Sequence, residues 1–233
     1  MAFLKKIFSA AADLFYPHIC LGCAHDLTDT DQLLCMHCIN DLPHTGFEKY
    51  ALNKTERIFY GRLPLRAAHS EYYFSKGGLI QQLIHEFKYR GNRDIGICLS
   101  ELMGTNMLLS GRFRDIDCLV PLPLYAEKEY KRGYNQAAVS CTGISNSMNI
   151  PVYDYNLVRR YATETQTRKH RAERWDNVSG SFNILRPDSF QNKHILLVDD
   201  VVTTGATLEA AALMLLNIPG ATISIATLTI AGK

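Results

Sequence analysis

The chain has 233 residues, of which 47% are hydrophobic, 21% charged and 10% aromatic. This composition is close to the globular average, and it excludes a mainly disordered chain, a collagen-like repeat and a small disulfide-stapled scaffold. The 25 Lys and Arg residues against 23 Asp and Glu residues give a formal net charge of +2, which argues against binding by bulk charge alone but not against a local basic patch. The longest apolar run, Ala210–Leu216, is far shorter than the roughly 18 residues of a membrane span.

Residues 1–16 begin the chain with apolar side chains at helical spacing, and Pro17 ends the predicted helix. The apolar run is too short for a signal peptide, and the charge of Asp13 interrupts it. An odd count of seven cysteines does not fit a secreted disulfide framework, so we expect a protein of the reducing cytoplasm. The apolar helix face either packs on the rest of the protein, which we favour, or docks on a partner or the membrane surface.

The remaining sequence divides into two parts. Residues 17–45 hold four cysteines among turn-forming and polar residues, and residues 46–233 alternate between strand-like and helix-like patterns. Strands that alternate with helices predict an α/β fold with a mostly parallel, doubly wound sheet. In chain order the patterns predict a strand over 66–74, helices over 78–89 and 95–109, a strand over 116–120, a helix over 137–148, a strand over 194–198, a helix over 206–216 and a strand over 222–230.

The N-terminal cysteines form two C-x-x-C pairs, Cys20 with Cys23 and Cys35 with Cys38, separated by eleven residues. One tight turn presents two thiolates to the same ion, so two such turns complete a closed tetrahedral shell of four sulfurs, which suits a structural Zn2+. A segment this small cannot build its own hydrophobic core, so we expect the metal to supply its folding energy. Free thiols and a redox pair are the alternatives. Nearby alternative ligands are His18, His25 and His37.

The most specific pattern runs from His194 to Thr207, H-I-L-L-V-D-D-V-V-T-T-G-A-T. It predicts a buried strand that ends in two carboxylates, a hydroxyl-rich turn, and then a helix. The N-terminus of a helix offers unpaired N–H groups and the positive end of the helix dipole, so it binds phosphate well. Gly205 allows close approach of the backbone, and Thr203, Thr204 and Thr207 add hydroxyl donors.

The two carboxylates in this pattern, Asp199 and Asp200, would repel a bare phosphate. We therefore expect them to accept hydrogen bonds from sugar hydroxyls or to face Mg2+. The alternative is a helix that one threonine caps, preceded by two solvated carboxylates. That alternative does not explain three threonines around a glycine.

Three further stretches carry cations or amides close to predicted element ends. The first is the end of the helix over 78–89, where Lys88 and Arg90 are, taken alone, ordinary C-terminal helix cations. The second is the rigid V-P-L-P stretch and the charged segment after it, with Val120, Pro121, Leu122, Pro123, Arg132, Asn135 and Gln136. The third places basic and amide side chains near Trp175 and Phe182: Arg159, Arg160, Gln166, Lys169, Arg171, Arg174 and Asn177.

Together these motifs make the chain resemble the ComF family of competence-associated, phosphoribosyltransferase-like proteins. In that family a four-cysteine zinc module precedes the F-K-Y-x-G, V-P-x-P, R-G-x-N-Q and R-x-x-N-x-x-G-x-F segments and the D-D-x-x-T-T-G-A-T loop. This sequence matches each of them in order, from residue 18 to about residue 230. The resemblance implies a type I phosphoribosyltransferase fold, a mostly parallel sheet flanked by helices, with a small N-terminal four-cysteine zinc module.

The resemblance also implies ligands and residue roles. The ligand would be phosphoribosyl pyrophosphate (PRPP) with Mg2+, and the setting would be DNA uptake or handling during natural competence. Asp199 and Asp200 would bind the ribose hydroxyls. The 5-phosphate would lie in a cradle formed by Thr203, Thr204, Gly205, Ala206 and Thr207. Lys88 and the Val120–Pro123 loop would lie near the pyrophosphate, and a mobile hood would carry Arg132, Asn135 and Gln136. The candidate catalytic residues are Lys88 and Arg132.

Three functions of different classes fit this sequence. The first is a phosphoribosyltransferase that releases pyrophosphate through electrostatic positioning, with an acceptor that the sequence does not identify. The second is a module that binds single-stranded nucleic acid and uses PRPP or a nucleotide as a regulatory ligand without turnover. The third is an adaptor whose N-terminal helix docks on a partner, for example a DNA-uptake protein. Residues that would serve the acceptor or the nucleic acid are Asn135, Gln136, Gln166, Arg171, Arg174 and Asn177.

Overall fold

The computed structural model describes residues 18–29, 31–159 and 182–231. Its centre is a four-stranded sheet in the order β1-β6-β5-β2, in which each neighbouring pair is parallel. The expected helix over residues 1–16 lies outside the described residues. The strands are β1 (Leu65–Phe74), β2 (Cys118–Pro121), β5 (His194–Val202) and β6 (Thr222–Ala231).

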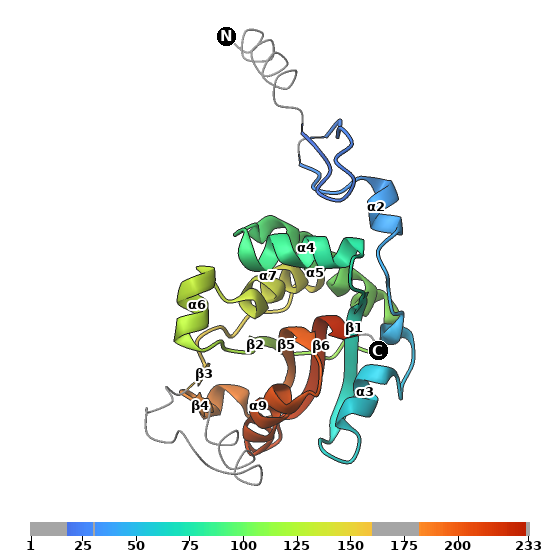
Figure 1. Cartoon of the computed structure of the whole chain (residues 1–233). Coiled ribbons are helices and arrows are strands. Elements are labelled where there is room, and N and C mark those ends of the chain that lie inside the picture. The colour runs from blue at the N-terminus through green and yellow to red at the C-terminus, as the bar shows by residue number, and fades with distance from the viewer. Residues whose placement is uncertain (1–17, 30, 160–181, 232–233) are drawn as a thin grey trace, which may run out of the picture.

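Helices cover both faces of this sheet (Figure 1). One face carries α4, α5 and α7, and the other carries α3 and α9. This arrangement confirms the predicted α/β fold with a parallel, doubly wound sheet, and the longer predicted helices agree with the observed ones within a few residues. Their bounds are Lys54–Phe59 for α3, Leu79–Tyr89 for α4, Arg93–Ser110 for α5, Gln136–Met148 for α7 and Ala206–Leu216 for α9.

The sheet separates two hydrophobic cores, and the strand side chains alternate between them. Along β5, Leu196 and Val198 belong to the core beneath α4, α5 and α7, whereas Ile195 and Leu197 belong to the core beneath α9. A pleated strand sends successive side chains to opposite faces, so a parallel strand covered on both sides must be apolar on both. This explains why the sequence of β5 begins as a continuous apolar run.

Close packing of α5 against α7 holds one helical layer together. A Cβ on Gly143 would lie 2.5 Å from the Ile97 carbonyl oxygen, and a Cβ on Gly104 would lie 3.1 Å from the Ile144 Cα. Glycine lowers helix propensity, but here the missing Cβ lets two helix backbones approach each other. Gly104, which weakens the sequence signal for α5, is therefore a packing residue.

Several short elements have no clear signal in the sequence, because a turn or two of helix is too short to show a period. These elements are α2 (Met36–Asn40), the 3-10 helix η1 (Phe47–Lys49), α3, α6 (Ala126–Arg132), the antiparallel pair of β3 (Leu157–Arg159) with β4 (Phe182–Ile184), and the 3-10 helix η3 (Pro187–Phe190).

Within the described ranges, no helix is both long and apolar enough to span a membrane.

The cysteine-rich segment shares a hydrophobic core with the domain, which differs from the expectation that a metal alone would stabilise it. Cys20, Leu34 and Cys38 are buried in the same cluster as the apolar residues of α4. The Gln82 side chain of α4 also donates a hydrogen bond to the Leu21 carbonyl oxygen at 2.7 Å. Burial against α4 therefore contributes to the stability of this segment.

We expect Gly143→Ala to destabilise the protein by about 1–3 kcal/mol, because the new methyl group would overlap the Ile97 carbonyl oxygen of α5. Urea unfolding followed by circular dichroism measures the change. Thr105→Ala, at an exposed position of α5, is the control and should change the free energy of unfolding by about 0.5 kcal/mol or less. Equal stability of Gly143→Ala and the wild type would contradict the close-packing account.

Candidate functional site

Strand β5 carries two carboxylates to the carboxyl end of the sheet, where parallel α/β proteins bind their ligands. The strand runs through Asp199 and Asp200 to Val202, so the turn begins later than the sequence predicts. By the alternation of side chains along β5, Asp200 lies on the face that α4 covers and Asp199 on the opposite face. The strand end therefore presents one carboxylate on each side of the sheet.

Two cations converge on Asp200. Lys88 Nζ, in the last turn of α4, lies 2.8 Å from Asp200 Oδ2, and Arg132 Nη1, at the end of α6, lies 3.9 Å from the same oxygen. The side chains of Lys88 and Asp200 are only 14% and 10% exposed, so this pair is largely removed from water. Lys88 is therefore part of the site and not an ordinary solvated cation at a helix end.

Asp199 has a different environment. Its Oδ1 accepts a hydrogen bond from the Asp200 backbone N–H at 2.8 Å. Burial and the negative charge of Asp200 raise the pKa of Asp199, while Lys88 and Arg159 oppose the shift. A ligand that brings positive charge or hydroxyl donors to this carboxyl stabilises its ionised form more than it would at a solvated aspartate.

The turn after β5 combines a close backbone approach with an open helix end. Gly205 has a φ of 74°, which disfavours a side chain, and a Cβ there would lie 2.6 Å from the Phe59 ring of α3. No side chain caps the N-terminus of α9. Thr203, Thr204 and Ala206 are exposed beside that end. The turn thus has the features of an anion site, with first-turn N–H groups that lack a side-chain partner.

An arginine that the sequence analysis missed fixes this turn. Arg62 Nη1 donates hydrogen bonds to the carbonyl oxygens of Ile58 at 2.9 Å and Thr204 at 3.1 Å. The same guanidinium pairs with Glu209, which is buried in the first turn of α9. A carboxylate in that turn would repel a phosphate, and the arginine neutralises it. No local sequence pattern connects residue 62 with residue 204, so only the folded chain reveals the contact.

The V-P-L-P stretch is more regular than the predicted loop. Val120 and Pro121 belong to β2 and pair with β5, and the Leu122 N–H still donates to the Val198 carbonyl oxygen at 2.8 Å. The side chains of Val120 and Leu122 are buried. The expected contacts of this stretch with a pyrophosphate would therefore depend on its backbone and on Pro121 and Pro123.

Asn135 and Gln136 begin α7 and are engaged by protein groups. Asn135 Oδ1 accepts the Ala137 N–H at 3.0 Å, and its Nδ2 donates to the Leu122 carbonyl oxygen at 3.1 Å. Gln136 is 1% exposed, and its Oε1 accepts a hydrogen bond from Arg132 at 2.7 Å. These contacts give both residues a positioning role, since they connect α7 with the end of β2 and with α6.

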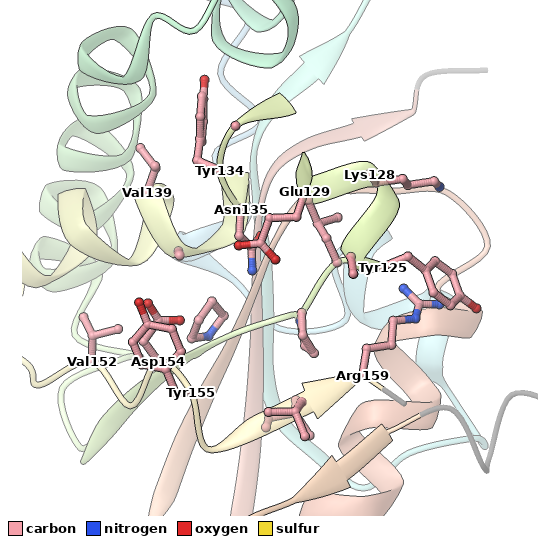
Figure 2. A pocket seen from close by; sticks show the side chains of 18 of the residues that line it. Tyr125, Lys128, Glu129, Tyr134, Asn135, Val139, Val152, Asp154, Tyr155 and Arg159 are labelled. Carbon is pink, nitrogen blue, oxygen red and sulfur yellow. The ribbon is translucent and has the colours of Figure 1, made fainter. Parts of the chain in front are cut away.

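A cleft of about 1150 Å³ adjoins this strand end, between α6, the start of α7 and β3 (Figure 2). Arg159 lies beside Tyr125, with the guanidinium 3.5 Å from the centroid of the ring. A second cation–ring pair joins Arg93 to Tyr134 at 4.7 Å. The lining of the cleft includes none of residues 199–207. Pro121 of the lining pairs with Val198, next to Asp199, so the cleft lies beside the end of β5. Its volume is sufficient for a small-molecule ligand.

Four of the expected acceptor-side residues lie outside the described residues: Gln166, Arg171, Arg174 and Asn177. Their roles stay predictions. The two ends of that segment are described, because Arg159 in β3 pairs with Phe182 in β4. The Arg159 guanidinium lies 5.2 Å from the centroid of the Phe182 ring.

The four cysteine sulfurs lie close together. The Sγ atoms of Cys20, Cys23, Cys35 and Cys38 all lie within 4.8 Å of one another, and those of Cys23 and Cys35 are 3.7 Å apart. Sulfurs that bind one tetrahedral Zn2+ at about 2.3 Å lie about 3.8 Å apart, so the spacing fits this ion. Although burial opposes the shift, the backbone N–H groups of Cys35 and Cys23 lower the pKa of Cys20 to about 6. Burial raises the pKa of Cys38, so this thiol would lose its proton when a metal binds. The spacing of the four sulfurs is therefore the observation that supports a metal site.

Comparisons with known proteins show which domain and which proteins this chain is similar to. Residues 136–232 match the model of the phosphoribosyl transferase domain, a range that includes the two carboxylates and the turn after them. The chain is similar to the DNA utilization protein YhgH of Salmonella typhi, with 29% identity over 146 residues that cover 61% of this chain and 63% of that protein. It is also similar to Competence protein F of Haemophilus influenzae (30% identity, 57% of this chain, 60% of that protein) and to Competence protein ComFC of Bacillus subtilis (31% identity, 66% and 60%). The chain thus spans less than two thirds of the length of these relatives.

We expect about one Zn2+ per chain to depend on the four cysteines. Cys23→Ser should remove this ion and lower the thermal midpoint, because three thiolates do not close the tetrahedral shell. Cys98→Ser, which changes a cysteine outside the cluster, is the control and should keep the metal. Metal analysis beside a thermal melt checks both variants. A folded wild-type protein that carries no metal would show that the cysteines have another role.

Proposed function

We propose that this chain is a phosphoribosyltransferase-like protein of the ComF family and that it binds PRPP at the carboxyl end of β5. The 5-phosphate would lie in the turn formed by residues 203–207, and Asp199 and Asp200 would accept hydrogen bonds from the ribose hydroxyls. Lys88 and Arg132 would face the pyrophosphate. The acceptor would enter through the adjoining cleft.

The observation that carries this proposal is the meeting of three kinds of group at one strand end. They are an uncapped helix N-terminus, two carboxylates and two cations. A ligand that is only an anion would bind to the helix N-terminus and to the two cations. The carboxylates need a different partner, because they repel phosphate and accept hydrogen bonds from hydroxyl groups. A ligand that joins a phosphate, a sugar and a pyrophosphate supplies a partner for each kind.

Electrostatic positioning would support group transfer at this site. As the bond from the ribose C1 to the pyrophosphate breaks, negative charge grows on the leaving group and positive charge on the sugar. Lys88 and Arg132 would stabilise the leaving group, and the carboxylates would stabilise the sugar. Lys88 and Arg132 engage Oδ2 of Asp200, so Oδ1 of the same carboxylate would be left to bind a hard cation such as Mg2+. When bound, Mg2+ would neutralise pyrophosphate charge.

Binding would require Lys88 to exchange partners. Its ion pair with Asp200 keeps both charges satisfied in a place with little access to water. Once ribose hydroxyls donate to Asp200, Lys88 becomes available to the pyrophosphate. The ion pair thus holds the cation ready at the site without leaving either charge buried and alone.

The protein partners and location are part of the same proposal. The names of the relatives refer to DNA utilization and to competence, which supports a role in DNA uptake or handling. The proposed location is the cytoplasm, because seven cysteines do not fit a secreted disulfide framework. Single-stranded DNA and a DNA-uptake protein are the proposed macromolecular partners. Arg171 and Arg174 would contact the DNA strand. Their replacement by alanine would weaken DNA binding and reduce its dependence on salt, because fewer counterions would be displaced.

We expect Asp199→Asn combined with Asp200→Asn to weaken PRPP binding at least tenfold, because each lost charge-assisted hydrogen bond contributes about 1.5–3 kcal/mol. Inorganic phosphate should lose much less affinity, since its contacts would come from the turn. Isothermal titration with PRPP and Mg2+, beside phosphate alone, measures both. Asp188→Asn, at an exposed carboxylate of η3, is the control. If the double variant binds PRPP as the wild type does, the carboxylates do not recognise the ribose.

We expect Lys88→Ala to weaken PRPP binding about tenfold but not the binding of ribose 5-phosphate, because only PRPP offers the pyrophosphate that Lys88 would contact. Arg90→Ala is a matched control at the end of the same helix, since Arg90 is 68% exposed and pairs with Glu86 on the surface. It should leave both affinities unchanged. Equal losses for the two ligands in Lys88→Ala would place Lys88 at the sugar or outside the site.

A further inference from the structure

A second group of ionisable side chains lies on β1, at the opposite edge of the sheet from β2. It consists of Glu48 from η1 and of His69 and Glu71 from β1, whose ligand atoms lie within 4.8 Å of one another. These residues are 5%, 0% and 1% exposed. The proposed binding of PRPP does not use them, and ionisable groups are rarely buried so completely without a partner.

Glu71 is fully engaged and orients the ring of His69. Its Oε2 accepts a hydrogen bond from His69 Nε2 at 2.7 Å, and its Oε1 accepts one from His44 Nδ1 at 2.7 Å and one from Asn106 Nδ2 at 2.8 Å. This network assigns a proton to Nε2 of His69. In the neutral imidazole the other ring nitrogen, Nδ1, then carries a lone pair.

That lone pair faces the carboxylate of Glu48. His69 Nδ1 lies 3.7 Å from Glu48 Oε2, which is too far for a hydrogen bond. Nδ1 is buried and has no hydrogen-bond partner among the described residues. Lys49 Nζ also lies 3.9 Å from Glu48 Oε1, but the Lys49 side chain is 76% exposed. Two electron-pair donors thus face each other inside the protein, an arrangement that is unfavourable unless a cation lies between them.

We propose that Glu48 and His69 bind a divalent transition-metal ion, with Zn2+ the best fit, at a site separate from the four cysteines. An ion about 2.1 Å from both His69 Nδ1 and Glu48 Oε2 spans their 3.7 Å separation at an angle of about 120°. Glu71 then has the usual place of the carboxylate that accepts the remote N–H of a metal-bound histidine. A donor set of imidazole and carboxylate suits Zn2+ better than Mg2+.

The charges of the cluster agree with this ion. The carboxylates of Glu48 and Glu71 are both buried, and the nearest cationic side chain to Glu48, Lys49, is 76% exposed. A divalent ion between His69 Nδ1 and Glu48 would place positive charge inside this cluster, next to the carboxylate of Glu48. The alternatives are a doubly protonated His69 and a water molecule that bridges Nδ1 to Glu48. The first leaves an N–H without an acceptor at hydrogen-bond distance, and the second adds no positive charge.

The ion would fasten η1 to β1. The chain passes from η1 into α3, and side chains of α3, Ile58 and Phe59, lie against Gly205 in the turn after β5. The site would therefore support, through α3, the turn to which we assign phosphate binding. It would be a structural metal site and would not contact a substrate.

The test is the zinc content of the full-length protein after equilibration with Zn2+ and removal of the free ion. We expect Glu48→Gln and His69→Gln each to contain about one Zn2+ per chain less than the wild type, while both remain folded by circular dichroism. His85→Gln, at an exposed position of α4, is the matched control and should contain as much zinc as the wild type. Because Glu48→Gln keeps the size of the side chain, it decides the outcome if His69→Gln does not fold.

Equal zinc content in the wild type and in Glu48→Gln would overturn the proposal and leave a protonated His69 or a bridging water as the explanation. The result is independent of PRPP, which is not present in the measurement. It is also independent of the cysteines, because the quantity compared is the difference between variants that keep all four of them.

Discussion

The ion pair between Lys88 and Asp200 is the interaction on which the geometry of the site depends. It joins the last turn of α4 to the carboxyl end of β5 in a place with little access to water, where either charge alone would be strongly unfavourable. The preceding residue, Phe87, is fully buried, and its carbonyl oxygen accepts a hydrogen bond from the Tyr134 hydroxyl. The position of Lys88 is therefore set from both sides, by the core beneath α4 and by the segment between α6 and α7.

A second constraint acts from the other face of the sheet. Gly205 leaves no room for a side chain because α3 lies directly against it, and Arg62 connects α3 to the turn and to α9. The turn is thus held by packing and by hydrogen bonds that no ligand has to form. A site arranged in this way loses little conformational freedom when a ligand binds, so more of the contact energy is retained as affinity.

The sequence predicted the parts of the molecule that depend on local pattern. The apolar residues of the long helices and of the strands recur at regular spacings that predict these elements. The four cysteines and the D-D-x-x-T-T-G-A-T loop have spacings that only a few kinds of site explain. The orientation of Asp199 and Asp200 was not predicted, because the strand was expected to end at Val198, whereas it runs to Val202 and sends the two carboxylates to opposite faces.

Contacts between distant segments were beyond the reach of the sequence. Without the family resemblance, Lys88 looked like an ordinary helix-end cation, because its partner lies on another element. Arg62 gave no signal, because Glu209 becomes its neighbour only in the fold. The strand was expected to end at Val120, yet pairing with β5 extends it through Pro121. The cluster of Glu48, His69 and Glu71 is invisible in the same way, since η1 and β1 meet only through tertiary packing.

The most direct test of the central claim is hydrogen exchange of the backbone N–H groups of residues 203–208, measured with and without PRPP and Mg2+. If the 5-phosphate accepts hydrogen bonds from the turn and from the first turn of α9, exchange there should slow by about tenfold or more at saturating PRPP. The amides in the middle of α5, on the opposite helical layer, should be unchanged. Unchanged exchange at residues 203–208 under saturating PRPP would contradict the claim that this strand end binds it.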